Sequence, residues 1–464
     1  MKNQKVFVMG HKNPDTDSIC SAIAYADIKN RTTQTKRYIP RRAGQINEET
    51  QYVLNRFGVQ PPAYLGNIGT QVKDMDIRPK PDADRTMSLK NAWDMMQNKG
   101  IVTLPICNSE DELEGIVTIG DIADVYMDTK DSYLLSNART QYNKIRDTLD
   151  GEIVEGNGHG YFTKGKILIG TADPEVMKNY IEENDMVILG NREEDQLKAI
   201  ELNVSCIIVG MSIQVSEKVI KKAQERQIII ISSPYDTYTI ARMINQSIPV
   251  NYVMKKDNLV TFNTEDFTDD IQDVMIKHRH RAFPVINKRG KCVGTISRRN
   301  FLDMHKKQVI LVDHNEKDQA VDNIEKAEIL EIIDHHKLGS LETMKPINFR
   351  NEPVGCTATI LYRIYDEQRL EIPPKIAGLL CAAIISDTLM FRSPTCTQQD
   401  KIAASALALI ADIKIEDFAR EMFKAGSNLK DKAPEEIFYQ DYKKFIAEGN
   451  VAFGVGQISS MDEE

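Results

Sequence analysis

The chain has 464 residues, more than one hydrophobic core normally holds, so several domains are expected. Its formal net charge of -9 and isoelectric point near 5.6 argue against nucleic acid as a partner, because binding a phosphate backbone needs a basic surface. No apolar run approaches the roughly 20 residues that span a bilayer, so no membrane segment is predicted. Seven scattered cysteines without a Cys-x-x-Cys pair indicate reduced thiols and a cytoplasmic protein.

The first predicted element is a short apolar strand, residues 5–10, that leads directly into a polar turn and a helix of small residues. The turn, GHKNPDTDS, brings one imidazole and two carboxylates close together, at His11, Asp15 and Asp17. On its own, such a turn also fits an ordinary helix cap, in which Asp17 or Ser18 accepts hydrogen bonds from the first helix amides. Its role therefore depends on what the rest of the chain brings to the same place.

Two later segments of the chain, residues 67–127 and 249–306, repeat each other without a gap. In each copy a helix is followed by two strands and a second helix. Matched residues lie 179 positions apart, as Pro105 and Pro284 do. Such a unit leaves one apolar sheet face uncovered, and two copies can bury that face against each other. We therefore expect the two copies to fold as a pair.

Between the two copies, residues 166–245 alternate four apolar strands with four helical patterns. This order is typical of a small α/β domain, which we place at residues 128–248.

The flanking segments, residues 1–66 and 307–425, also alternate apolar strands with helices, which predicts a parallel α/β sheet interrupted by the insertion. The carboxyl ends of parallel strands meet at one edge of a sheet, where ligands bind. These strands end in acidic and imidazole groups, and a later helix supplies another carboxylate. The groups expected at this edge are His11, Asp15, Asp17, Asp313, His314, Asp334, His335, His336 and Asp387.

Carboxylates crowded at one place cannot all stay ionised unless cations neutralise them. The mixed nitrogen and oxygen donors suit Mn²⁺ or Co²⁺ better than an ion that prefers thiolates, and are too rich in nitrogen for a pure Mg²⁺ or Ca²⁺ cage. If one carboxylate is shared, the set can hold two metal ions about 3.5–4 Å apart. The sequence therefore predicts a two-metal centre.

The motifs GHKNPDTDS, VDHNE, DHH and SDT, extended by residues 40–50 and 386–400, closely resemble the DHH phosphoesterase superfamily. Within it, the chain resembles family II inorganic pyrophosphatases that carry inserted CBS and DRTGG domains. The resemblance implies two metal sites that share one bridging carboxylate. The implied ligands are His11, Asp15 and Asp313 for one metal, and Asp17, Asp313, His335 and Asp387 for the other.

The same resemblance implies the hydrolysis of diphosphate to two phosphates by a metal-activated water. It implies two tightly bound Mn²⁺ or Co²⁺ ions and a further Mg²⁺ that arrives with the substrate. It assigns contacts with the substrate to His336 and Lys443. His314, Asn315 and Glu316 are expected to support the ligands.

The two repeated copies resemble CBS domains, which pair to bind adenine nucleotides. The resemblance implies that Thr118 and Asp121 hold phosphate and ribose, with Ser297 and Asn300 at the matched places of the second copy. It further implies regulation by AMP, ADP, ATP or diadenosine polyphosphates and a homodimer formed through these domains. The alternative is a purely structural or dimerising pair with an empty pocket.

The middle domain resembles DRTGG domains, but GNR and VGM stand at residues 190–192 and 209–211 where the naming residues of that family would be. We therefore expect a spacer or interaction domain there. Residues 426–464 resemble the first part of a DHHA2-like lobe and end before the Ser-Arg-Lys-Lys-Gln segment whose cations bind phosphate in the family. From this we expect an incomplete substrate-binding lobe.

Two further hypotheses stay open at this point. One is a different DHH phosphodiesterase or an exonuclease, although the glycine-rich Gly-Gly-Gly-His run of those relatives is missing from the sequence and its charge is acidic. The other is a catalytically weak, adenylate-sensing protein, because the last lobe is incomplete.

Overall fold

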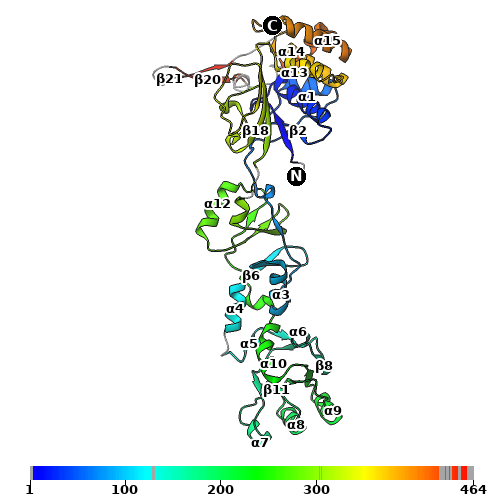
Figure 1. The fold of residues 1–464 in the computed structure, drawn as a ribbon, viewed down its shortest axis with the longest axis vertical. Helices are drawn as coiled ribbons and strands as arrows, with labels where there is room; N and C mark the ends of the chain where they lie inside the picture. The colour runs from blue at the N-terminus through cyan, green and yellow to red at the C-terminus, as the bar shows by residue number, and fades with distance from the viewer. Residues whose placement is uncertain are drawn as a thin grey trace. The chain divides into compact units, whose positions relative to one another are not determined.

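The computed structural model describes residues 4–127, 131–302, 304, 306–427, 434, 438, 442–447 and 451–456. The chain divides into two compact units (Figure 1). The first joins Met1–Thr70 to His305–Glu464, and the second is the intervening segment Gln71–Met304. The finer domain limits proposed from the sequence, at residues 66, 127, 248, 306 and 425, stay predictions.

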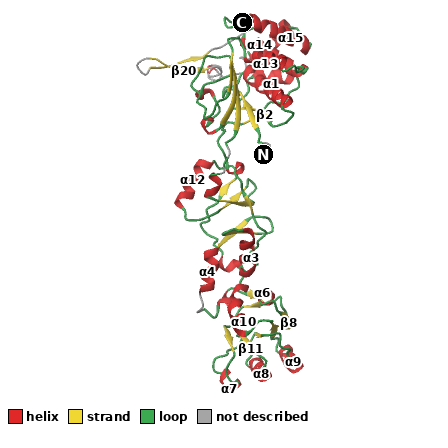
Figure 2. Cartoon of the chain, in the orientation of Figure 1, coloured by secondary structure: helices red, strands yellow, loops and turns green. Residues whose placement is uncertain are grey.

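The first unit is built on a six-stranded sheet in which all neighbouring strands are parallel (Figure 2). This confirms the predicted parallel α/β class. On one side of the sheet β1 is followed by β2 and β3, and on the other side β17 is followed by β18 and β19. The direction in which successive strands are added therefore reverses between β1 and β17. Ligands bind outside the carboxyl ends of strands at such a point. In spatial order the strands are β19 (Asn348–Asn351), β18 (Glu328–Asp334), β17 (Gln308–Val312), β1 (Val6–Met9), β2 (Tyr38–Arg42) and β3 (Ala63–Tyr64).

The residues of the two central strands alternate between two hydrophobic cores, as the period of a strand requires. Val8 and Ile310 belong to the larger core, while Met9 and Leu311 belong to the core on the opposite face. The larger core is shared with helices gathered on one side of the sheet in Figure 1. These helices are α1 (Thr16–Thr32), α13 (Thr357–Glu367), α14 (Pro374–Asp387) and α15 (Gln398–Ala411), with α2 (Glu48–Arg56) and α16 (Ile415–Gly426) beside them.

The middle of the second unit is a five-stranded sheet of order β10-β11-β12-β13-β8, parallel except for β8. Its four parallel strands are the four that the sequence predicts, and helices alternate with them. The elements are β8 (Glu152–Glu155), β10 (Ile167–Ile169), α7 (Pro174–Met177), β11 (Met186–Leu189), α8 (Glu193–Glu201), β12 (Cys206–Val209), α9 (Glu217–Glu225), β13 (Ile229–Ser232) and α10 (Thr237–Met243). Short elements precede this sheet, at α5 (Leu134–Asn137), β7 (Thr140–Gln141) and α6 (Tyr142–Thr148), or follow it, at η2 (Ile244–Ser247) and α11 (Val250–Val253). Strand β9 (Tyr161–Phe162) lies in the chain between β8 and β10 and pairs with β7.

The two repeated copies exchange the segments that lead into them. Strand β4, which precedes the first copy's helix, pairs with β16 of the second copy, and Lys255 bridges to Ile116 on β6 of the first. The matched glycines make this possible: a Cβ would lie 2.7 Å from the Lys255 carbonyl oxygen at Gly115, and 2.1 Å from the Arg78 carbonyl oxygen at Gly294. The first copy consists of η1 (Val72–Asp74), β4 (Arg78–Pro79), α3 (Leu89–Lys99), β5 (Thr103–Cys107), β6 (Leu113–Thr118) and α4 (Ile119–Met127). The second copy consists of β14 (Phe262–Asn263), α12 (Thr268–Lys277), β15 (Phe283–Ile286), β16 (Cys292–Ile296) and η3 (Arg298–Phe301).

The end of the second copy differs from the prediction. The second helix expected in each copy is α4 in the first, but in the described part of the second copy it is only the 3-10 turn η3. There the Arg298 side chain reaches back to the carbonyl groups of Met275 and His278 near the end of α12, and the amides of Asn300 and Leu302 close three-residue turns. None of the helices in the described ranges has an apolar stretch long enough to cross a bilayer.

Candidate metal centre

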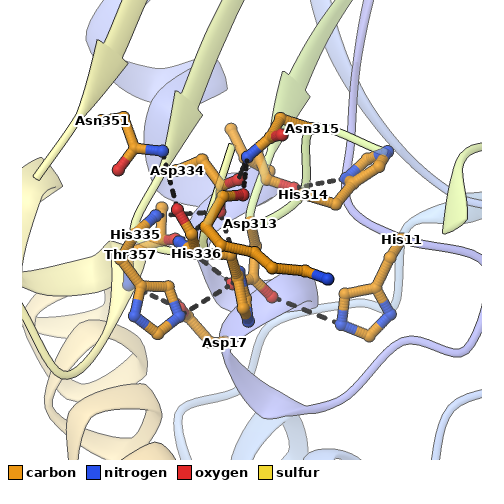
Figure 3. A network of polar contacts seen from close by, with 12 residues as sticks. His11, Asp17, Asp313, His314, Asn315, Asp334, His335, His336, Asn351 and Thr357 are labelled. Atoms are coloured by element: carbon orange, nitrogen blue, oxygen red, sulfur yellow. Dashed lines mark hydrogen bonds and ion pairs between the residues drawn. The ribbon is translucent and has the colours of Figure 1, made fainter. Parts of the chain in front are cut away.

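The six predicted metal ligands converge beyond the carboxyl ends of β1, β17 and β18, although they come from distant parts of the sequence. Figure 3 shows His11 on one side of Asp313, with His335 and His336 on the other. In each of three overlapping groups the ligand atoms lie within 4.8 Å of one another, and Asp313 belongs to all three. The groups are His11, Asp15 and Asp313; Asp17, Asp313, His335 and Asp387; and Asp313, His335 and His336.

Asp15 forms the N-terminal cap of α1 and faces His11 at the same time. One of its oxygens accepts a hydrogen bond from the Ser18 amide at 2.9 Å, and the other lies 3.3 Å from His11 Nε2. The capping interpretation of this turn was therefore right about a cap but wrong about its residue, which is Asp15 rather than Asp17 or Ser18. A carboxylate is favoured there by the unpaired amides and positive end of the helix.

Asp17 is fully buried and is held by the start of another helix, α13. The backbone amides of Thr357 and Ala358 donate to its two oxygens, at 2.7 and 3.2 Å, and the Ser21 hydroxyl donates at 2.6 Å. The Thr357 hydroxyl donates to Asp313 at 3.2 Å, so this one residue fixes two carboxylates. Sequence reasoning missed Thr357, because a helix start leaves amides unpaired without indicating which carboxylate they meet.

Asp313 follows β17 with a left-handed backbone, φ 64°, and its side chain is buried. Its two oxygens lie 3.4 Å from His11 Nε2 and 3.5 Å from His335 Nε2. Burial works to raise the pKa of Asp313, but the two imidazoles outweigh burial and hold that pKa well below its usual range. Asp313 is therefore the carboxylate that stays ionised at the centre of the group.

The neighbouring carboxylates behave in the opposite way. Burial, together with the Asp313 charge, raises the pKa of Asp17 to about 7. Burial and the charge of Asp17 raise the pKa of Asp387 well above its usual range. Burial works to lower the pKa of His335, but the hydrogen bond and charge of Asp313 raise it to about 9. Without cations, protons must neutralise this cluster, and divalent metal ions of the Mn²⁺ or Co²⁺ type fit in their place.

The two adjacent imidazoles, His335 and His336, are oriented by different partners. His335 Nδ1 lies 3.0 Å from the Val354 carbonyl oxygen, which leaves Nε2 facing the carboxylates. His336 Nδ1 lies 2.9 Å from Asp334, a carboxylate that is completely buried. That contact raises the pKa of His336, whose side chain is half-exposed. Asp334 thus holds the His336 ring in place while part of the ring stays open to a ligand.

The residues expected to support the ligands have three different surroundings. The Asn315 amide donates to Asp334 and so helps to orient His336. His314 Nδ1 lies 3.0 Å from the Val312 carbonyl oxygen, and burial lowers the pKa of His314 to about 4. Glu316 lies 3.4 Å from the Lys337 ammonium group, and the support expected of it for the ligands stays a prediction.

The remaining predicted residues are less well placed. Lys443 belongs to β20 (Tyr442–Ala447), which pairs with β21 (Val451–Gly456). The structure describes the backbone of this strand but not the Lys443 side chain, so the phosphate contact predicted for it stays a prediction. In the second unit, the Thr118 hydroxyl donates to Asp121 at 2.6 Å, and the Ser297 hydroxyl donates to Asn300 at 2.9 Å. Both pairs follow a strand and close a turn.

A cavity of about 390 Å³ lies between the two copies. Of the four predicted nucleotide contacts, Thr118 lines it, whereas Asp121, Ser297 and Asn300 are not among its described lining residues. The cavity is lined by Val102, Thr103, Ile116, Thr118, Ile119, Gly120, Lys255, Arg279, His280, Arg281 and Ala282.

Comparison with known proteins places these features in a family. The N-terminal domain of the DHH family matches residues 5–384, and the DHHA2 domain matches residues 420–464. A cobalt-dependent inorganic pyrophosphatase of Clostridium perfringens is 44% identical over 459 residues, which are 99% of this chain and 83% of that protein. A probable manganese-dependent inorganic pyrophosphatase of Thermotoga maritima is 35% identical over 460 residues, again 99% and 83%.

Among solved structures, the CBS and DRTGG domains of the regulatory region of the Clostridium perfringens pyrophosphatase, complexed with diadenosine tetraphosphate, are 34% identical. That structure is covered completely, by 49% of this chain, with a TM-score of 0.47. The sequence matches of the preceding paragraph show that the chain belongs to the DHH family and, within it, to the family of cobalt- and manganese-dependent inorganic pyrophosphatases.

Proposed function

We propose that this protein is an inorganic pyrophosphatase that depends on Mn²⁺ or Co²⁺ and hydrolyses diphosphate to two phosphates. The observation that carries the proposal is the pair of ligand groups that meet at Asp313, in a chain that is 44% identical to a cobalt-dependent inorganic pyrophosphatase. In the proposed site His11, Asp15 and Asp313 hold one metal ion, and Asp17, Asp313, His335 and Asp387 hold the other.

When bound, the metal ions would supply positive charge for the phosphate oxygens and would lower the pKa of a water molecule at the site. The chain's own residues fix the charge and the position of the ligands. Asp313 stays ionised between two imidazoles, and the amides at the start of α13 fix Asp17 beside it. His336, held by Asp334, donates a hydrogen bond to a phosphate oxygen and stabilises negative charge that develops there.

The test is phosphate release from pyrophosphate by metal-free protein and by protein supplied with Mn²⁺ or Co²⁺. We expect turnover only with the metals, and its loss when a chelator removes them. Nucleotide release from a dinucleotide, without phosphate release from pyrophosphate, would favour the alternative of a DHH phosphodiesterase. Metal and nucleotide binding without either reaction would favour an adenylate sensor.

Regulation by adenine nucleotides is the second part of the proposal. The cavity between the repeated copies has cationic groups for phosphates, Lys255, Arg279 and Arg281, and apolar groups such as Ile116 and Ile119 for a base. Asp121 lies 3.0 Å from the Lys255 ammonium group and hydrogen-bonds Thr118, so it positions two residues of the lining. The regulators proposed are AMP, ADP, ATP or diadenosine polyphosphates.

Asp121→Ala should weaken the response of pyrophosphate turnover to AMP. Loss of its charged hydrogen bonds, each contributing roughly 1.5–3 kcal/mol, should raise the AMP concentration for half-maximal effect about tenfold or more. The matched control is Asp124→Ala, which removes an exposed carboxylate one turn further along α4. Equal AMP curves for the two variants and the unmodified protein would contradict the assignment of this cavity.

Four finer statements stay predictions of the sequence. They are the further Mg²⁺ that arrives with pyrophosphate, the phosphate contact of Lys443, a homodimer formed through the paired copies, and a cytoplasmic location. The role of the middle domain as a spacer or interaction domain is also a prediction from the sequence.

A further inference from the structure

Glu49 connects two separate parts of the candidate metal centre without being one of its ligands. It lies in the first turn of α2, where a carboxylate is favoured by the positive end of the helix. Its Oε1 accepts a hydrogen bond from the Thr16 hydroxyl at 2.7 Å and another from the Ser386 hydroxyl at 2.5 Å. A carboxylate oxygen has the two lone pairs that this double contact needs.

The two hydroxyls stand next to ligands on different helices. Thr16 lies between Asp15 and Asp17 at the start of α1, and Ser386 directly precedes Asp387 at the end of α14. One oxygen atom of Glu49 therefore bridges these two helix ends. Three of the six proposed ligands lie immediately beside its contacts.

The surroundings of Glu49 favour a fixed geometry. Thr16 and Thr50 are completely buried, and their hydroxyl oxygens lie 3.0 Å apart, so Thr16 is held from two sides. A Cβ added at Gly426, the last residue of α16, would lie 3.0 Å from the Glu49 Cβ. The absence of a side chain at Gly426 thus lets α16 end close against Glu49.

We infer that Glu49 is a positioning residue of the metal centre, which holds the α1 and α14 ligands at the spacing that a bound divalent cation needs. The inference rests on the proposed function for its chemical meaning, but it concerns metal affinity and not the reaction itself. Residues that orient metal ligands typically change affinity 10–100-fold when they are lost.

The test measures Mn²⁺ affinity and stoichiometry by equilibrium dialysis, without substrate and well below the unfolding temperature of every variant. Glu49→Ala should weaken Mn²⁺ binding about 10–100-fold. Glu49→Gln should stay close to the unmodified protein, because its amide oxygen can accept both hydroxyls. Ser386→Ala should weaken binding in the intact protein but add little in the Glu49→Ala background, as expected for partners in one network.

The matched control is Glu421→Ala, which removes another glutamate that contacts α2, through the Tyr52 hydroxyl at 2.6 Å, away from the ligands. It should leave Mn²⁺ affinity unchanged. Unchanged affinity in both Glu49→Ala and Ser386→Ala would overturn the inference, as would an equal loss in Glu421→Ala. If the unmodified protein binds Mn²⁺ but releases no phosphate from pyrophosphate, the proposed function fails while the affinities still decide the role of Glu49. If it binds no Mn²⁺, both fail.

Discussion

Asp313→Asn should lower pyrophosphate hydrolysis by roughly 10³-fold or more, because both proposed metal ions lose the carboxylate that they share. The substitution keeps the size of the side chain. It also suits the left-handed backbone at this position, φ 64°, which asparagine adopts more readily than most residues. The loss therefore reports the charge of residue 313 and not a change of fold.

Two measurements separate this effect from simple damage to the protein. The number of tightly bound Mn²⁺ ions should fall below two, and the rise in unfolding temperature that Mn²⁺ gives the unmodified protein should shrink. Asp185→Asn is the matched control, since Asp185 is also buried but lies in the middle domain, where it accepts the Lys166 and Glu182 amides. A variant at 313 that keeps two Mn²⁺ ions and most of its activity would contradict the bridging role.

Gly44→Ala should impair the metal centre although Gly44 is not one of the proposed ligands. A Cβ at this position would lie 2.0 Å from the backbone carbonyl oxygen of Lys12 and 2.7 Å from Pro14, so either the backbone at Gly44 or the loop between His11 and Asp15 must move, and we expect the loop to move. Overpacking of this kind costs about 1–3 kcal/mol of stability. A displacement of about 1 Å at a catalytic group can lower turnover about 100-fold.

The control for Gly44→Ala is Gly190→Ala, where an added Cβ meets no atom within 4 Å. It should leave turnover and Mn²⁺ affinity unchanged. For Gly44→Ala we expect weaker Mn²⁺ binding together with slower phosphate release at saturating pyrophosphate. Normal kinetics in that variant would mean that the loop can shift without moving His11 or Asp15.

The main features of the fold and the ligand set could be predicted from the sequence because both follow from a simple regularity. Strands β1 and β17 are short and apolar, and each is followed by its polar groups within a few residues. In a parallel sheet this order places His11 and Asp313 at the same edge. The repeated copies could be recognised because their matched positions keep one constant offset, as Gly115 and Gly294 do.

The contacts that orient these groups could not be predicted in the same way. Thr357 and Glu49 act through hydrogen bonds between elements that are far apart in the chain, and no local pattern encodes such a pairing. The turn at Asp15 shows a related limit, since Asp15 caps a helix and also belongs to a group of possible metal ligands, and the sequence pattern is the same for both roles. In the second copy the described residues after β16 form only the 3-10 turn η3, where Arg298 contacts carbonyl groups near the end of α12, and a sequence pattern does not show such a contact.

The central position of β1 has a consequence for how the protein is made. Val6 pairs with Tyr38 of β2 on one side and with Gln308 of β17 on the other, so the ribosome must synthesise the whole inserted unit before β1 can meet its second neighbour. Asp387 is made later still, so the nascent chain cannot assemble the complete ligand set until α14 has emerged. The entropic cost of closing such a long loop is small, because each doubling of loop length costs only about 0.6 kcal/mol. During this delay one edge of the unfinished sheet stays exposed on the nascent chain. An inserted unit that folds promptly by itself shortens the time for which other unfolded segments are exposed as well, and is therefore an advantage.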